Sequence, residues 1–175
     1  TKLKAPSRNK MDLELHIYDP ITGYSPVVGF SIKSDIGHSP TLLNPAKNTR
    51  VRYSVSGLTK QQVEEINSIG STVTRDYIVR RISRLFELAE DVRFCELRDV
   101  TFNNNLVMID SMMPQIYGEM VLQHYRRIEE AIYNCSSLVD WIKTTNPMGY
   151  GNSESYTYKF KKLLCASALG MVPGT

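Results

Sequence analysis

The first third of the chain alternates apolar and polar positions and predicts strands. In residues 12–19, Leu and Ile alternate with Asp, Glu and His, which is the period of two expected of a half-buried strand. The turn-forming stretch Asp-Pro-Ile-Thr-Gly ends this segment, and residues 27–33 form a second strand-like run. We expect these two segments to pair as an antiparallel hairpin. Residues 49–55 predict a third strand.

After residue 58 the apolar period changes to that of helices. Thr59 and Gln62 have the spacing of a capping box, which predicts a helix that ends at about residue 69. Along residues 75–88 apolar residues recur at helical spacing, with arginines on the other faces. The remaining predicted elements are a strand at 92–97, a mostly helical stretch at 106–127 with a start or kink at Pro114, and helices at 136–144 and 156–169.

Strands precede helices along the chain, so the order of elements predicts the α+β class. The 175 residues suffice for one domain with a sizeable core. The chain opens without Met and stops directly after a helical pattern, so we expect a fragment of a longer chain, or a chain that lacks some residues.

Composition adds a few exclusions. Hydrophobic residues make up 42% and charged residues 22%, as in ordinary globular proteins. No run approaches the roughly 20 apolar residues of a membrane span, and no signal peptide is apparent, so we expect a cytoplasmic protein without membrane contact. The widely spaced Cys95, Cys135 and Cys165 fit neither a metal site nor a disulfide framework, and we expect reduced thiols packed in the core.

The net charge is only +3, so total charge does not predict nucleic-acid binding, but the basic residues are clustered. Such clusters could neutralise phosphates, or they could be ordinary solvated surfaces. They are Lys2, Lys4, Arg8 and Lys10 before the first strand, Lys47, Arg50 and Arg52 after the second, and Arg75, Arg80, Arg81 and Arg84 on one predicted helix.

Each strand of the predicted hairpin carries a polar face. If the two faces point to the same side, a carboxylate and an ammonium converge at the open end of the hairpin. This arrangement suits phosphodiester hydrolysis, in which a carboxylate anchors Mg²⁺ and a lysine orients water or stabilises developing charge. Taken alone, an exposed strand face with ordinary charges explains the pattern at least as well. The faces are Asp12, Glu14 and His16 on one strand, and Gly29, Ser31 and Lys33 on the other.

Three stretches of the sequence form a distinctive set: Arg-Asn-Lys-Met-Asp-Leu at residues 8–13, Gly-Phe-Ser-Ile-Lys-Ser at 29–34 and Pro-Thr-Leu-Leu-Asn at 40–44. Together they resemble the HpaII-type family of type II restriction endonucleases. Shorter pieces at 105–114 and 168–171 resemble the family as well. The resemblance runs from about residue 6 to the end of the chain, and its most specific piece is Gly-Phe-Ser-Ile-Lys-Ser.

The resemblance implies a PD-(D/E)xK-like nuclease core, in which helices flank a mixed central sheet that contains the antiparallel hairpin. Residues 1–175 would then form one restriction-endonuclease-like catalytic domain. The implied activity is Mg²⁺-dependent cleavage of double-stranded DNA at a specific short site, beside a companion DNA methyltransferase. A palindromic target would suit a homodimer. Two alternatives stay open: a nucleic-acid-binding module with a decayed active site, and a non-specific or repair nuclease.

Carried over to this sequence, Asp12 matches the metal-binding Asp and Lys33 the catalytic Lys. Asp19 lies in the same hairpin, but its place in the turn is away from Lys33. Ser31 stands where the motif usually has a second acid, and a hydroxyl is a poorer Mg²⁺ ligand than a carboxylate. The candidate catalytic residues are therefore Asp12, Glu14, Ser31 and Lys33, and the candidate metal ligands are Asp12, Glu14 and the Ile32 carbonyl.

The missing second acid leaves a choice between Glu14 and Asp35, or a shell completed by backbone carbonyl and water. Glu14 ranks first because it shares a strand face with Asp12. Residues 103–105 are three asparagines that could read base edges, although such a run is more often a helix start with Asn as its cap. The candidate DNA contacts are Arg8, Lys10, Ser34, Thr41 and Asn44.

Overall fold

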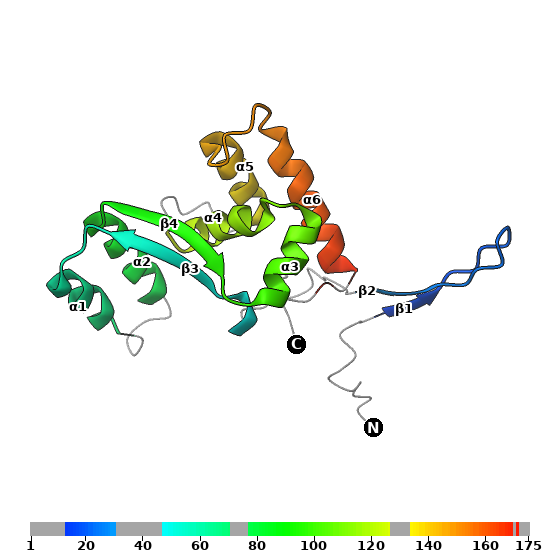
Figure 1. Cartoon of the computed structure of the whole chain (residues 1–175), viewed down its shortest axis with the longest axis horizontal. Helices are drawn as coiled ribbons and strands as arrows, with labels where there is room; N and C mark the ends of the chain where they lie inside the picture. Colours follow the sequence, from blue (N-terminus) through cyan, green and yellow to red (C-terminus); the bar gives the residue numbers. More distant parts are fainter. Residues whose placement is uncertain (1–12, 31–46, 71–76, 127–133, 170, 172–175) are drawn as a thin grey trace, which may run out of the picture.

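The computed structural model describes residues 13–30, 47–70, 77–126, 134–169 and 171. In these residues the strands come first and helices dominate afterwards, so the predicted α+β class is confirmed. Figure 1 shows a body of helices around one long two-stranded ladder, and a separate hairpin that extends away from it. No helix of the described part is both long and apolar enough to cross a bilayer.

The hairpin consists of β1 (Leu13–His16) and β2 (Val27–Phe30), which pair antiparallel as predicted. Asp19 organises the turn: its carboxylate accepts hydrogen bonds from the Ile21 amide (2.9 Å) and the Thr22 hydroxyl (2.6 Å). Gly23 has φ +67°, a conformation that glycine adopts without strain. The local turn chemistry therefore fixes the hairpin.

The longer ladder pairs β3 (Val51–Ser56) with β4 (Asp91–Leu97), and a short 3-10 helix, η1 (Lys47–Thr49), precedes it. The register shifts between Arg52 and Tyr53, so that Arg52 lies opposite Glu96 and Tyr53 opposite Phe94. This irregularity breaks the strict alternation of β4. It allows both Phe94 and Leu97 to pack against the helical core.

The expected mixed central sheet is not what the described residues form, because their strands make two separate antiparallel pairs. The alternation of the sequence identifies each strand correctly, but it does not specify the partner of a strand. The chain between β3 and β4 contains α1 (Lys60–Ser68) and α2 (Tyr77–Leu88), and it returns β4 antiparallel alongside β3. The PD-(D/E)xK core remains an expectation from the resemblance.

The helix pair α1–α2 begins and ends at sites readable in the sequence. The predicted capping box is present: the Gln62 amide donates to Thr59 Oγ1, and the Thr59 amide donates to Gln62 Oε1. Arg81 of α2 closes the other end of α1 by donating to the carbonyls of Ile69 (2.8 Å) and Asn67 (2.7 Å). These contacts hold the two helices together.

The stretch 106–127 is mostly helical as predicted, and the predicted start at Pro114 is confirmed, because two helices occupy this region and the second begins there. They are α3 (Val100–Ile109) and α4 (Met113–Arg126), and Pro114 lies in the first turn of α4, where proline is tolerated. Asp99 caps α3 by accepting from the Phe102 amide at 2.8 Å. The asparagines 103–105 therefore lie inside α3 and do not start a helix.

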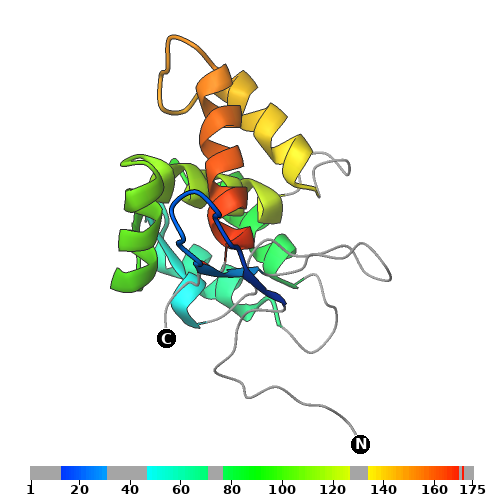
Figure 2. The ribbon, with the colours of Figure 1, turned by 90° about the vertical axis from the view of Figure 1, so that its right-hand side faces the viewer.

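The hydrophobic core lies between α3, α4, one face of β4 and the pair α5 (Cys135–Thr145) and α6 (Glu154–Ala168). Figure 2 shows α5 and α6 together at one end of the molecule. The most completely buried large side chains are Tyr156, Phe102, Leu106, Met113, Ile116, Ile142 and Leu163. The core is thus mainly a helical one, with the ladder at its edge.

A close approach joins the ladder to α4. A Cβ added to Gly118 would overlap Cδ2 of Phe94 and lie 2.7 Å from its Cε2, so only glycine fits here. The Tyr53 hydroxyl donates to the Gly118 carbonyl oxygen at 2.7 Å. Burial, with Glu119 and Tyr117 nearby, raises the pKa of Tyr53. This tyrosine therefore stays a neutral donor at physiological pH.

The three cysteines are free, as expected, but the prediction that they pack in the core is wrong, because all three are exposed. Cys95 illustrates the reason. It lies at the register shift of β4, between Phe94, which packs on the core, and Glu96, which pairs with Arg52 on the outer face. Small apolar residues are often buried, but the local backbone decides the direction of each side chain.

Candidate active site and basic surface

Glu14 is the one predicted catalytic or metal-binding residue that falls within the described part of the chain. The others lie outside the described residues: Asp12, Ser31, Ile32 and Lys33, the alternative acid Asp35, and the candidate DNA contacts Arg8, Lys10, Ser34, Thr41 and Asn44. The structure therefore describes the hairpin that carries Glu14, and the other residues of the predicted site stay predictions.

The register of the hairpin decides whether the polar faces of its two strands lie on the same side. Glu14 lies opposite Gly29, and Leu13 lies opposite Phe30. Paired residues of an antiparallel ladder project to the same face. The polar face of β1 and the face of β2 that begins with Gly29 are therefore on the same side of the hairpin. This is the condition on which the predicted convergence depends.

The Glu14 carboxylate is available for a ligand. Its side chain is 51% exposed, and its Oε1 lies 3.6 Å from His16 Nε2, which is a weak and solvent-screened pair. In the described ranges no group of three or more His, Cys, Asp or Glu side chains is placed to hold a metal ion. Glu14 could thus supply one oxygen ligand, and further ligands would have to come from elsewhere.

A basic hollow of about 190 Å³ lies where the β3–β4 ladder meets α3. This basic hollow is lined by Lys47, Arg50, Arg98 and Asp99. Arg50 and Arg98 are the positions directly beyond the Val51–Leu97 pair, and the Arg98 amide donates to the Arg50 carbonyl at 3.0 Å. Sequence clustering identified Lys47 and Arg50 but missed Arg98. The available signal was that Arg98 directly follows a strand, just as Arg50 precedes one.

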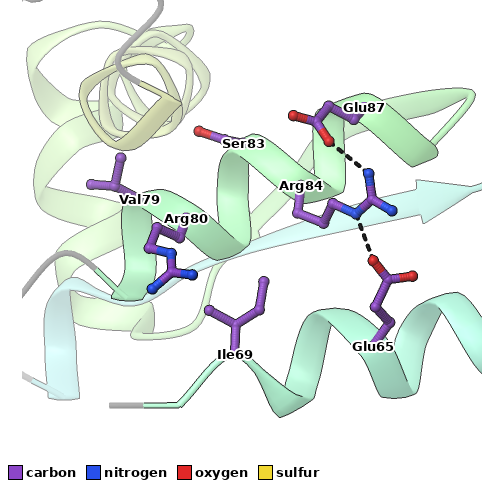
Figure 3. Close-up of a pocket in the computed structure, with 7 residues that line it drawn as sticks. All are labelled: Glu65, Ile69, Val79, Arg80, Ser83, Arg84 and Glu87. Carbon is purple, nitrogen blue, oxygen red and sulfur yellow. Dashed lines mark hydrogen bonds and ion pairs between the residues drawn. The ribbon is translucent and has the colours of Figure 1, made fainter. Parts of the chain in front are cut away.

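A second hollow, of about 330 Å³, lies between α1 and α2 (Figure 3). Arg84 bridges its two carboxylates: Nε lies 2.7 Å from Glu65 and Nη1 lies 2.7 Å from Glu87. Hydrogen bonds to both glutamates raise the pKa of Arg84. With Arg80 also on its lining, the hollow holds two cations and two anions, so it has no excess charge with which to attract an ionic ligand.

The Asp110 segment, which carries part of the family resemblance, has a structural role. The Lys159 ammonium of α6 donates to Asp110 Oδ2, and the Met112 amide donates to Oδ1 at 3.0 Å. Burial would raise the pKa of Asp110, but these two donors outweigh it and lower the pKa overall. Both side chains of the ion pair are largely buried. The pair fastens α6 to the turn between α3 and α4.

Two comparisons with known proteins point to the same family. The family model of the HpaII restriction endonuclease matches residues 1–175. The chain is similar to the type II restriction enzyme HpaII of Haemophilus parainfluenzae, with 34% identity over 176 aligned residues that cover 99% of this chain. Those residues make up 47% of that enzyme, so the chain spans about half of its length. No solved structure is significantly similar to the chain. On this evidence the chain belongs to the HpaII restriction endonuclease family.

Proposed function

We propose that this chain carries the active site of an endonuclease that cuts double-stranded DNA at a specific short site with the help of Mg²⁺. The match to the family model along residues 1–175 carries the proposal. The name of the similar Haemophilus enzyme supports it. The hairpin register supports the location of the site, because it sets Glu14 and Gly29 on one face.

We place the site by extending the described ladder one step along each strand. In this proposal Asp12 would be the partner of Ser31, because the described register pairs Leu13 with Phe30. Lys33, two residues beyond Ser31, falls on the same face as Asp12 and Glu14. The carboxylates and the ammonium would thus meet at the open end of the hairpin, away from the Asp19 turn.

The donor set fits a magnesium ion, because carboxylate and carbonyl oxygens are the ligands that this hard ion prefers. We propose that Asp12, Glu14 and the carbonyl oxygen of Ile32 hold it. When bound, the ion polarises the phosphate and lowers the pKa of a coordinated water. Lys33 orients the attacking water and stabilises the charge that develops on the phosphate oxygens. Ser31 leaves room between these groups.

Cleavage of plasmid DNA in the presence of Mg²⁺ tests the function. Discrete bands are expected, and smears would instead indicate a non-specific nuclease. Lys33→Ala should abolish cleavage while DNA binding stays near wild type, because Lys33 acts on the reaction and not on recognition. A folded Lys33→Ala protein that cuts at the wild-type rate would refute the site. Binding of DNA with no cutting by wild type would favour the decayed module, for which Ser31 is the supporting observation.

The second acid can be found by substituting the candidates separately. Glu14→Gln should lower single-turnover cleavage by orders of magnitude at saturating Mg²⁺, as expected for loss of a metal ligand. His16→Gln, two residues along the same strand face, is the matched control and should change the rate little. If Glu14→Gln is fully active and Asp35→Asn is not, then Asp35 is the second acid. Full activity of both would leave Asp12, the Ile32 carbonyl and water as the ligand set.

We further propose that the enzyme acts as a homodimer on a palindromic target, since two-fold symmetry in the protein matches two-fold symmetry in the site. Such an enzyme would have a companion methyltransferase that protects the same site in cytoplasmic DNA. Sedimentation of the protein with and without a duplex of the cleaved sequence measures the stoichiometry. One protomer for each bound duplex would refute the dimer.

A further inference from the structure

The basic hollow has an excess of positive charge that the described part of the protein leaves uncompensated. Lys47, Arg50 and Arg98 are exposed, and no described carboxylate forms an ion pair with any of them. The fourth lining residue, Asp99, directs its Oδ1 to the Phe102 amide at the start of α3, at 2.8 Å. Three cations therefore face one carboxylate that is already engaged.

The position of the two arginines makes this excess unfavourable in the absence of a ligand. Arg50 and Arg98 lie side by side at the end of the ladder, joined through their backbones. Like charges on opposing strand positions destabilise a ladder. At the next outward-facing pair an arginine is neutralised by an acid on the opposite strand, because Arg52 lies 2.9 Å from Glu96. Asp99, the one acid among the described lining residues of the hollow, accepts from the Phe102 amide and forms no ion pair with either arginine in the described part, so an anion between the cations would remove the repulsion.

The arginines of α2 provide an internal comparison. Arg81 donates to the carbonyls of α1, and Arg84 is held between Glu65 and Glu87. Both are committed to the fold, although the sequence marks them as a basic cluster like the one at residues 47–52. Within the described ranges, Arg50 and Arg98 lack the side-chain partners that Arg81 and Arg84 have, as expected of a surface that binds a ligand.

We propose that Lys47, Arg50 and Arg98 hold a backbone phosphate of bound double-stranded DNA in the basic hollow. This inference rests on the proposed function for the identity of the anion. The two arginine guanidinium groups offer several N–H donors each, which suits the oxygens of a phosphodiester. Such a contact carries no sequence information, so it positions the duplex and contributes equally to specific and non-specific binding.

The test uses a double-stranded oligonucleotide of arbitrary sequence, without divalent cations, and measures Kd by fluorescence anisotropy over a range of salt concentrations. The variant is Arg50→Ala with Arg98→Ala. The matched control is Arg93→Ala with Lys143→Ala, which also removes two positive charges, but from residues paired with Asp91 and Glu154. The hollow variant should bind about tenfold more weakly or worse, as expected from lost charge-assisted hydrogen bonds. Its salt slope should fall by about 0.9, which is one phosphate contact.

The control should keep the wild-type slope. Equal slopes for wild type and the hollow variant, or equal losses in the two double variants, would overturn the proposal. If the alanine variant does not fold, as judged by its circular dichroism spectrum, the measurement is repeated with Lys47→Gln and Arg50→Gln together, which retain side-chain bulk. A salt slope equal to that of wild type, or a loss of affinity equal to that of the control, would again overturn the proposal. If the wild-type protein binds this DNA but never cuts plasmid, the proposed nuclease function is refuted, and the phosphate site is still decided by the hollow variant. If the wild-type protein cuts plasmid and the hollow variant binds DNA as wild type does, only the phosphate site is refuted.

Discussion

The two ladders of this protein have the same antiparallel pairing but differ in what supports them. The β3–β4 ladder has Leu97 almost fully buried, and Phe94 and Val51 pack on the helical core. In the β1–β2 hairpin, Leu13, Leu15 and Val27 are 42–52% exposed. One ladder is part of the fold, and the other is held chiefly by its own pairing and its turn.

Because of this difference, the residues proposed for function and the residues that stabilise the fold lie in different parts of the molecule. The hairpin carries Glu14, and Asp12 and Lys33 are close to its strands in the sequence, so the residues proposed for chemistry lie on or next in sequence to the less supported ladder. The β3–β4 ladder has no predicted catalytic residue, but it fixes the basic hollow at its end. Substitutions in the hairpin should therefore affect cleavage more than unfolding, and those in the core face of the other ladder should do the reverse.

The largest expected contrast is between two leucines. Leu97→Ala should lower the free energy of unfolding by about 2–5 kcal/mol, because it empties a buried site in the core. Leu15→Ala should change it by less than about 1 kcal/mol, because the side chain is already 42% exposed to water and its removal leaves no buried cavity. Denaturant titration of both variants measures the difference. A loss at Leu15 as large as that at Leu97 would mean that the hairpin face is covered in solution, and the contrast would fail.

The next effect is expected where α4 touches the ladder. Gly118→Ala should destabilise the protein by about 1–3 kcal/mol, since the new methyl group overlaps the Phe94 ring; the better helix propensity of alanine offsets part of this. Gly151→Ala is the control, because its Cβ would meet no atom within 4 Å. Adding Phe94→Leu to Gly118→Ala should recover part of the loss. Thermal unfolding that is unchanged by Gly118→Ala would show that the helix and the ladder are further apart.

A smaller effect is expected from removing one hydroxyl group in each ladder region. Tyr53→Phe should lower the unfolding free energy by about 1 kcal/mol at neutral pH, because the Gly118 carbonyl loses its 2.7 Å donor. Tyr24→Phe in the hairpin, where the ring is 69% exposed, should leave it within about 0.5 kcal/mol. Equal values for both tyrosines, measured by chemical denaturation, would contradict the distinction.

The smallest effect concerns the pH response of the hairpin turn. Hydrogen bonds from Thr22 and from the Ile21 amide hold the pKa of Asp19 below its ordinary value of 3.8. A carboxyl with a lowered folded-state pKa stabilises the folded form above its unfolded-state value, and this contribution is lost as pH falls through the lowered pKa. Acidification below about pH 4 should therefore open the turn first. Amide exchange should rise at Ile21 while β4 stays protected, and Asp19→Asn should weaken this pH dependence. Simultaneous loss of protection in both ladders would contradict this order.

Local features of the fold were readable from the sequence. The strand at 13–16, the turn around Asp19, the Thr59 capping box and the helix along 77–88 depend on residues that are neighbours in the chain. Side-chain hydrogen bonds to nearby amides and the period of apolar residues act over a few positions, so the sequence contains the information directly. The start of α3 at Val100 was missed because Asp99, and not the asparagine run, supplies its cap.

For the candidate site, the sequence alone supplied the family resemblance and the choice of Asp12, Glu14, Ser31 and Lys33. It left open whether the polar faces of the two strands lie on the same side. The register that sets Glu14 opposite Gly29 resolves this for the described pair. Pairing fixes the face of every residue at once, because a slip of one position would turn all the side chains over.

The tertiary structure alone decided that β3 pairs with β4 and which charges have partners. Before folding, Arg50 and Arg84 are equivalent members of basic clusters, and Arg98 is isolated. Folding brings Glu65 to Arg84 and sets Arg98 beside Arg50, where no carboxylate of the described residues forms an ion pair with either arginine. The chain segments concerned are far apart in sequence, so their meeting depends on the packing of α1 on α2, of α2 on α4, and of α4 and β3 on β4. Local periodicity contains no record of such contacts, because it describes only the neighbours of each residue.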